Sequence, residues 1–394
     1  MNYRYDPETD RVHKMTSGKN LYDYFAAKGF FFSKEVLTRY YFSLKTKPFV
    51  ILSGISGTGK TKIAQLFASY ICQEDDKDEA GKRVAFVSVR PDWMDNKGLL
   101  GYHNILDEKY HSEKMLNLLL EAQEHPDKPY FVILDEMNLA KVEHYFSDFL
   151  SVLESRTPDN PQGEAIQLHS LELAETHDGR IIPGEIHIPA NVFFAGTVNV
   201  DESTYMFSPK VLDRANVIEF NEVDLDGYAK GYQDRDGLIL EDAEVLSRFY
   251  ESSGQPFCHK KDYADLNPDG KNSLQALLVI LKKYNLHFGY RVANELSRFI
   301  NLAEKELANF ELDDALDIQI LQKILPKLHG TRAKLEEPLG SLIAFCHGVD
   351  APISEEQLQK PRSDDSEARF PRSARKIAQM LHQLSIQGYV SFIE

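Results

Sequence analysis

The segment L-S-G-I-S-G-T-G-K-T-K-I-A-Q at residues 52–65 follows the apolar run F-V-I-L and precedes a helical pattern. A glycine, four further residues and then Gly-Lys-Thr have the spacing of a phosphate-binding loop. Between a strand and a helix, such a loop points backbone N–H groups at phosphate oxygens, and the helix start adds the positive end of its dipole. The sequence therefore predicts a nucleotide-phosphate site formed by Gly54, Ser56, Gly57, Thr58, Gly59, Lys60 and Thr61.

Short apolar runs alternate with helical patterns between residues 46 and 222. The runs are F-V-I-L at 49, V-A-F-V-S-V at 84, Y-F-V-I-L at 130, V-F-F-A-G-T at 192 and V-I-E-F at 217. This alternation predicts an α/β fold with a parallel sheet covered by helices on both faces, and ligands of such sheets collect at the carboxyl ends of the strands. An acidic loop at 73 and a hairpin between about 164 and 190 are expected to interrupt the pattern.

The chain on either side of this region has helical periodicity. It predicts a short helical extension over residues 1–45, and a helical lid and C-terminal domain over residues 223–394 with an exposed loop at 359. The extension is too small for a core of its own, because fewer than about 40 residues rarely sustain one. We therefore expect three regions, of which the α/β domain at residues 46–222 carries the phosphate loop.

Composition and charge exclude several classes of protein. No apolar run approaches the roughly 18 residues of a membrane-spanning helix, and the polar start lacks the apolar core of a secretory signal. Three widely spaced cysteines cannot form a disulfide framework, so we expect a reducing, cytoplasmic setting. The excess of 61 acidic over 45 basic residues repels nucleic acid, so any DNA contact must be local. Candidate basic patches, a type of cluster that is more often a solvated face, are Lys45 with Lys47, Lys282 with Lys283, and Arg372 with Arg375 and Lys376.

Polar side chains end two of the predicted strands. In Y-F-V-I-L-D-E, Asp135 is expected to hold Mg²⁺ together with Thr61, and Glu136 to orient and deprotonate an attacking water. In V-F-F-A-G-T-V-N, the Asn199 amide could hydrogen-bond both that water and the terminal phosphate. The structural alternatives are helix capping by the two carboxylates and an ordinary turn at the asparagine.

Two arginines are further candidates. Arg214, in S-P-K-V-L-D-R-A-N, precedes the last strand, where it is usable only from a neighbouring subunit and would neutralise charge on the transferred phosphoryl group. A salt bridge to Asp213 or Glu219 is the alternative. Arg291, in H-F-G-Y-R-V-A-N-E-L, is expected to contact phosphate across the domain interface, with a surface ion pair as its alternative.

These features together resemble the AAA+ NTPase superfamily. The strings D-E-M-N-L-A-K-V-E-H-Y-F-S-D-F-L-S-V-L-E and G-T-V-N-V-D-E-S-T-Y-M-F-S-P-K-V-L-D-R-A-N are similar to the branch that holds the motor subunit of McrBC-type restriction systems and, more distantly, the MoxR-type chaperones. The resemblance covers residues 46–310. By analogy, residues 54–61 are the Walker A loop, Asp135 and Glu136 Walker B, Asn199 sensor 1, Arg214 the trans-acting finger and Arg291 sensor 2.

The resemblance implies a Mg²⁺-dependent NTPase that forms a homo-oligomeric, hexameric ring. Such a ring would power DNA translocation through its centre or activate a partner nuclease of the McrC type in defence against foreign DNA. The alternative is a protein-remodelling chaperone of the MoxR type. No nuclease constellation is recognisable in the chain itself, so DNA cleavage would need a second protein.

Some positions depart from the two families. The restriction GTPase has an N-T-x-D signature where this chain reads Asn199-Val200-Asp201-Glu202, so its preference for GTP does not transfer. Weighed against that relative, the habit of the superfamily favours ATP. MoxR-type members usually have an arginine where Leu139 stands here. The residues before 46 are also too few for the large domain that reads modified DNA in the best-known restriction relative.

Two smaller features have alternative interpretations. Trp93, in R-P-D-W-M-D-N-K-G-L-L-G-Y-H-N, lies in a segment that could face a central pore or a partner, or it could pack in the core. The pairs Cys258-His259 and Cys346-His347 lack the ligand spacing of zinc sites, so we expect ordinary packing there.

Overall fold

The computed structural model describes residues 2–6, 11–15, 20–72, 82–157, 160–200, 205–221, 223, 225, 240, 245–252, 257–349 and 368–393. The predicted acidic loop at 73, residues 359–367 of the predicted exposed loop, and the departure at Asp201 and Glu202 lie outside the described residues. Within the described part, no helix is long and apolar enough to cross a membrane.

The centre of the molecule is a five-stranded parallel sheet with the strand order β13-β3-β12-β7-β4. The apolar runs of the sequence form these strands, so the predicted α/β fold is confirmed. Their bounds are β3 Phe49–Gly54, β4 Val84–Ser88, β7 Tyr130–Asp135, β12 Val192–Asn199 and β13 Asn216–Glu219. Because all five are parallel, their carboxyl ends lie at one edge of the sheet.

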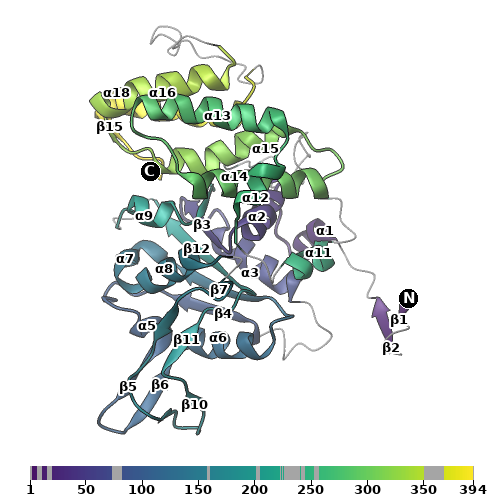
Figure 1. The fold of residues 1–394 in the computed structure, drawn as a ribbon, viewed down its shortest axis with the longest axis vertical. Coiled ribbons are helices and arrows are strands. Elements are labelled where there is room, and N and C mark those ends of the chain that lie inside the picture. The colour runs from purple at the N-terminus through teal and green to yellow at the C-terminus, as the bar shows by residue number, and fades with distance from the viewer. Residues whose placement is uncertain are drawn as a thin grey trace.

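Helices cover both faces of this sheet (Figure 1). Successive residues of a strand point to opposite faces, and β12 illustrates this with two phenylalanines. The Phe193 ring lies 4.8 Å from that of Phe249 in α11 (Val245–Ser252), whereas the Phe194 ring lies 5.7 Å from that of Phe146, just before α8 (Ser147–Ser155). Other helices of this region are α3 Lys60–Ile71, α5 Lys97–Leu100, α6 Lys114–Glu124, α7 Val142–Tyr145 and α9 Pro209–Leu212, with the 3-10 turn Met137–Leu139.

Small antiparallel strands project from the end of the molecule opposite the C-terminal helices (Figure 1). The predicted hairpin between 164 and 190 consists of two pairs, β8 (Ala165–Gln167) with β11 (Glu185–His187), and β9 (Ala174–Glu175) with β10 (Ile181–Ile182). A hairpin that the sequence analysis missed is formed by β5 (Gly101–Asn104) and β6 (Lys109–Ser112).

Trp93 lies beside these insertions and packs within the protein. Its ring centroid is 5.5 Å from that of Tyr145, and a Cβ at Gly98 would come within 2.2 Å of the indole. Of the two interpretations of this tryptophan, packing is the one that the structure supports.

The C-terminal part is helical, as predicted. α14 (Tyr290–Glu306) packs against α12 (Lys260–Asp265), α15 (Leu312–Gln319) and the N-terminal α2 (Lys34–Thr46). α13, α16 and α18 form the outermost layer (Figure 1). The remaining bounds are α13 Pro268–Lys283, the π-helix Ile320–Ile324, the 3-10 helix Leu325–Lys327, α16 Arg332–Cys346, α18 Pro371–Gln387, and the strand pair β14 Gly330–Thr331 with β15 Tyr389–Val390.

The N-terminal segment differs from the helical extension that the sequence predicts. β1 (Asn2–Asp6) and β2 (Arg11–Met15) form an antiparallel pair before α1 (Leu21–Ala27). α2 is no peripheral element, because every residue from 37 to 46 is buried. Helical periodicity alone did not indicate that this helix is part of the main core.

Most charges of two candidate basic patches form ion pairs within the protein, although Arg375 is exposed. Lys45 and Lys47 are buried, and their ammonium groups bind Glu306 at 2.6 Å and Glu295 at 2.5 Å. In the third patch, Arg372 forms a bidentate pair with Glu35, with both contacts at 2.9 Å. Lys376 of the same patch is buried against Glu219, as its 2.5 Å ion pair indicates. These charges bind within the protein, whereas Lys282 and Lys283 are exposed.

Candidate active site

The phosphate loop joins the end of β3 to the start of α3, as the sequence predicts. Gly57 and Gly59 have φ values of 83° and 92°, which side-chain-bearing residues rarely adopt. A Cβ at Gly54 would lie 2.4 Å from the carbonyl oxygen of Phe220, so the loop also needs glycine for the close approach of β13. The tight turn brings the backbone N–H groups of this loop and the start of α3 to one place.

Lys60 lies within this loop and is almost completely buried. Its ammonium group donates to the backbone oxygens of Gly54 at 2.8 Å and Ile55 at 2.6 Å. Thr58 Oγ1 donates to the same Ile55 oxygen at 3.0 Å. A buried lysine bonded to neutral carbonyls is well suited to a phosphate, because an anionic acceptor makes stronger bonds with an ammonium group.

Asp135 at the end of β7 collects two hydroxyl groups. Its Oδ1 accepts hydrogen bonds from Thr61 Oγ1 of the loop and from Thr197 Oγ1 of β12, both at 2.8 Å. Hydroxyl and carboxylate oxygens are the ligands that Mg²⁺ prefers, so this cluster fits that ion. The sequence analysis missed Thr197, although it stands two residues before Asn199 in the adjacent strand and therefore on the same face.

Glu136 has a backbone conformation that is unusual for its residue type. Its φ of 53° lies in the left-handed region, and its N–H donates to Thr197 Oγ1 at 3.0 Å. Asn199 Nδ2 approaches Glu136 Oε1 at 3.4 Å, and Asn138 Nδ2 donates to the Asn199 carbonyl oxygen at 3.3 Å. Strained conformations of this kind concentrate at functional sites. The carboxylate and the amide expected to handle water thus lie side by side.

The two candidate arginines lie elsewhere, near the amino ends of the strands. β13 begins at Asn216, which pairs with Val50 near the start of β3, and Arg214 precedes it by two residues. Along β3, Val50 is four residues from Gly54, or about 13 Å at about 3.3 Å per residue. Arg214 is therefore separated by most of the sheet from the phosphate loop of its own chain.

Arg291, at the start of α14, lies beside Arg214 and not beside the phosphate loop. Both guanidinium groups bind the carboxylate of Glu154 at the end of α8, and Arg291 also binds Asp213. Burial and the positive charge of Arg291 lower the pKa of Arg214. Burial would raise the pKa of Asp213, but Lys327 and Arg291 outweigh that and hold it below its ordinary value.

The expectation that Arg291 contacts phosphate across the domain interface stays a prediction, because in the single chain Arg291 binds Glu154 and Asp213. In the structure both arginines form ion pairs, the alternative weighed from sequence, although the partner of Arg214 is Glu154 and not Asp213 or Glu219. The two guanidinium groups form one pair at one end of the sheet.

A buried ion cluster fixes this end of the sheet. The carboxylate of Glu295 in α14 lies between Lys47 and Lys323, each at 2.5 Å, and Lys323 also donates to the backbone oxygens of Asp213 and Ala215 at 2.9 Å. Burial would raise the pKa of Glu295, but the two lysines lower it to about 2. Burial lowers the pKa of Lys323 to about 7, against the opposing effect of Glu295. The cluster ties α14 to the segment that carries Arg214.

Phe32, before α2, lies against the phosphate loop and was also missed. A Cβ at Gly59 would meet the Phe32 ring at 2.9 Å. The ring contacts Phe25 and Phe220, with centroid separations of 5.8 and 6.3 Å. Residues before the α/β domain thus contribute to the walls of the nucleotide site.

Comparison with known families agrees with this geometry. Residues 49–215 match the family described as an AAA domain of the dynein-related subfamily, and residues 245–389 match a domain of unknown function, DUF8727. Residues 49–215 are an AAA+ domain. The AAA+ domain contains the phosphate loop, both carboxylates, Asn199 and Arg214, whereas Arg291 belongs to the second match.

One relative supports this assignment by its sequence. The chain is 26% identical over 202 residues to the type IV methyl-directed restriction enzyme EcoKMcrB subunit of Escherichia coli strain K12. That match covers 51% of this chain and 40% of the relative, so it spans less than half of the relative's length. A solved structure of a candidate ATPase from Cytophaga hutchinsonii aligns with a TM-score of 0.44 and 12% identity over 74% of this chain and 81% of that one. Residues 49–215 are thus of the AAA type found in NTPases, and about half of the chain is similar to a McrB subunit.

Proposed function

We propose that this protein hydrolyses nucleoside triphosphate, with ATP favoured over GTP, at sites completed between subunits of a hexameric homo-oligomeric ring. The separation of the two groups of residues carries the proposal. The phosphate loop, Asp135, Glu136 and Asn199 meet at the carboxyl ends of three adjacent strands. Arg214 and Arg291 both bind Glu154 near the amino ends of the strands, where one chain cannot bring them to its own phosphates.

Each group at the carboxyl ends has a distinct role in the proposed reaction. Lys60 and the loop N–H groups bind the outer phosphates. Thr61 and Asp135 hold Mg²⁺, which when bound neutralises charge on the phosphates. Glu136 takes a proton from the attacking water, and the Asn199 amide, 3.4 Å from that carboxylate, orients it.

The arginine pair would act on the phosphates of the neighbouring subunit. Guanidinium groups stabilise charge that develops on the transferred phosphoryl group, and fingers of this kind contribute about 10³–10⁵ in rate. In the single chain, Glu154 and Asp213 hold both side chains in place. A triphosphate presented by a neighbour offers these arginines a more highly charged partner than either carboxylate.

We propose that hydrolysis serves a cytoplasmic restriction or defence system, by activation of a McrC-type partner nuclease or by DNA translocation through the ring. Similarity to the EcoKMcrB subunit supports this class. Among these activities, the charge distribution favours action on a protein partner. Lys45 and Lys47 are buried in ion pairs, and the exposed pair Lys282 and Lys283 remains as the candidate for a DNA contact.

Because Lys45 and Lys47 are not available for DNA, a second function is also consistent with the structure. This function is the remodelling of a protein in the manner of MoxR-type chaperones. The β5–β6 turn exposes Ile105 and Leu106, with 85% and 95% of their surfaces accessible, and apolar turns of this kind suit contact with a polypeptide. Hydrolysis of ATP and GTP, measured with and without duplex DNA, separates the functions, because remodelling predicts no stimulation by DNA.

The subunit-interface claim is tested by Arg214→Ala. Turnover should fall by about 10³–10⁵ while nucleotide binding persists, and Arg332→Ala, which removes an exposed arginine of α16, serves as the matched control. Wild-type turnover in Arg214→Ala would contradict the proposal.

A mixing experiment sharpens this test. Glu136→Gln and Arg214→Ala should each be inactive alone. A ring assembled from an equal mixture of the two would place an intact catalytic loop beside an intact arginine at roughly a quarter of its interfaces. We therefore expect the mixture to regain part of the wild-type turnover. A mixture as inactive as its components would show that subunits do not share sites in this way.

A further inference from the structure

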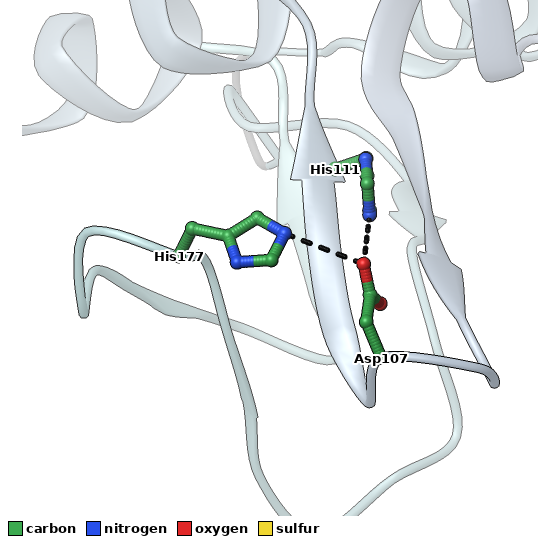
Figure 2. Close-up of side chains that lie close together, drawn as sticks. All are labelled: Asp107, His111 and His177. Carbon is green, nitrogen blue, oxygen red and sulfur yellow. Dashed lines mark hydrogen bonds and ion pairs between the residues drawn. The ribbon is translucent and has the colours of Figure 1, made fainter.

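The two projecting hairpins bring together three side chains from distant parts of the sequence. Asp107 stands in the turn between β5 and β6, His111 in β6, and His177 in the turn between β9 and β10. Figure 2 shows that both imidazole rings point toward the Asp107 carboxylate. The cluster belongs to the insertions, and none of its residues takes part in the proposed hydrolysis.

The ligand-type atoms of the cluster are close to one another. His111 Nε2 lies 2.7 Å and His177 Nε2 lies 3.3 Å from the same carboxylate oxygen of Asp107 (Figure 2). The three atoms all lie within 4.8 Å of one another. Ligands at about 2.1 Å from a tetrahedral Zn²⁺ are separated by roughly 3.4 Å, so small side-chain movements would admit an ion.

Neighbouring groups hold the three side chains in this arrangement. The second oxygen of Asp107 accepts the backbone N–H of Lys109 at 3.1 Å, which leaves the first one directed at the histidines. The His111 ring stacks on Tyr102, with centroids 5.5 Å apart and planes 9° apart. Lys109 also forms an ion pair with Glu175 of the other hairpin. Contacts of this kind orient ligands around metal sites.

We propose that Asp107, His111 and His177 form a binding site for a divalent transition-metal ion of the Zn²⁺ class. Two imidazole nitrogens and one carboxylate oxygen favour such an ion over Mg²⁺ or Ca²⁺, which prefer oxygen ligands. The side chains of His111 and His177 are 39% and 65% exposed, so an ion can enter directly from solvent and water can complete its coordination.

The bound ion would join the two hairpins. Asp107 and His111 come from one of them and His177 from the other, 66 residues further along the chain than His111. The exposed Ile105 and Leu106 stand directly before Asp107, so the same ion would also fix the apolar turn in position. The site is therefore structural in character and its ligation is independent of nucleotide.

The test uses the untagged full chain without nucleotide, and excess Mg²⁺ is added to compete at the proposed oxygen site around Asp135. Calorimetric titration with Zn²⁺ should give one bound ion, and Co²⁺ in its place should give the visible absorption of a nitrogen- and oxygen-ligated ion. His177→Ala should weaken Zn²⁺ binding at least about tenfold. Because His177 lies in an exposed turn, this substitution leaves the fold intact.

His103→Ala is the matched control. His103 lies in β5, in the hairpin that also carries Asp107 and His111, but it does not belong to the cluster. Zn²⁺ binding by this variant should therefore equal that of the wild type. Zn²⁺ should also slow proteolysis of the β5–β6 turn in the wild type and not in His177→Ala. Equal Zn²⁺ stoichiometry and affinity in the wild type and His177→Ala, or no Zn²⁺ bound by the wild type, would overturn the proposal.

Discussion

The two ends of the central sheet use charge in different ways. At the carboxyl ends, hydrogen bonds join charged groups to neutral partners, as for Lys60 with two backbone carbonyls and Asp135 with two hydroxyls. At the amino ends, charged groups bind opposite charges, as for Arg214 and Arg291 with Glu154. At the carboxyl ends, a phosphate and its metal ion can replace the neutral partners of Lys60 and Asp135 at small cost in free energy. At the amino ends, the arginines can leave Glu154 only if another anion takes its place.

This difference indicates that the two ends respond to different events. The carboxyl end is arranged for a ligand that diffuses in from solvent. At the amino end, Glu154 neutralises both guanidinium groups in the single chain, and in the proposed ring the triphosphate of the neighbour would replace it. Binding at one end and docking at the other are thus separable steps, and each can be tested alone.

The largest expected effect concerns whether both arginines act on the neighbour. Arg214→Ala and Arg291→Ala should each lower turnover, by about 10³–10⁵ for the finger. When the two variants are mixed, every interface then lacks one of the two guanidinium groups, so turnover should stay low. If the mixture instead regained the turnover expected from roughly a quarter of intact interfaces, Arg291 would act on the phosphates of its own chain. That result would contradict a joint role for Arg214 and Arg291, which both bind Glu154.

The next effect concerns the stability of the amino end. Glu295→Gln would leave Lys47 and Lys323 buried without their carboxylate, which costs about 3–5 kcal/mol in the free energy of unfolding. Glu304→Gln in the exposed part of the same helix is the matched control and should change this free energy little. Urea unfolding at pH 7 measures both. Equal stability of the two variants would show that the cluster does not hold α14.

The wild type and Glu295→Gln should differ in free energy of unfolding by an amount that depends on pH, and the lowered pKa of Glu295 gives the direction. A pKa of about 2 in the folded protein, against 4.5 ordinarily, contributes about 3 kcal/mol above pH 4.5. Protonation removes this contribution as the pH falls through the folded-state pKa. The difference in free energy of unfolding between the wild type and Glu295→Gln should therefore decrease as the pH falls from 4.5 toward 2. A difference that stayed constant over this range would show that the pKa of Glu295 is not lowered.

Local sequence signals account for one end of the sheet far better than for the other. The phosphate loop, Asp135, Glu136 and Asn199 each stand at the end of a buried strand. Parallel strands bring such ends together, so their meeting was predictable. The pairing of Arg291 with Glu154 joins residues 137 positions apart, and that of Lys47 with Glu295 joins residues 248 apart. No periodicity reports which distant charges pair.

The same limit applies to the elements that the sequence analysis missed. The β5–β6 hairpin has short strands of four residues each, and its approach to His177 depends on tertiary packing. The burial of α2 also depends on packing, because its periodicity resembles that of a surface helix. The chemistry at strand ends was thus readable, and the partners of buried charges were not.

The smallest expected effect tests whether the segment before α2 belongs to the carboxyl end. Phe32→Ala removes the ring that supports Gly59, so the phosphate loop should bind nucleotide less well, with KM rising up to about tenfold and kcat nearly unchanged. Phe31→Ala is the matched control, because its side chain is exposed and adjacent in sequence. If Phe32→Ala lowered the melting temperature and left KM unchanged, Phe32 would serve core packing alone. In that case the nucleotide site would end at the AAA+ domain itself.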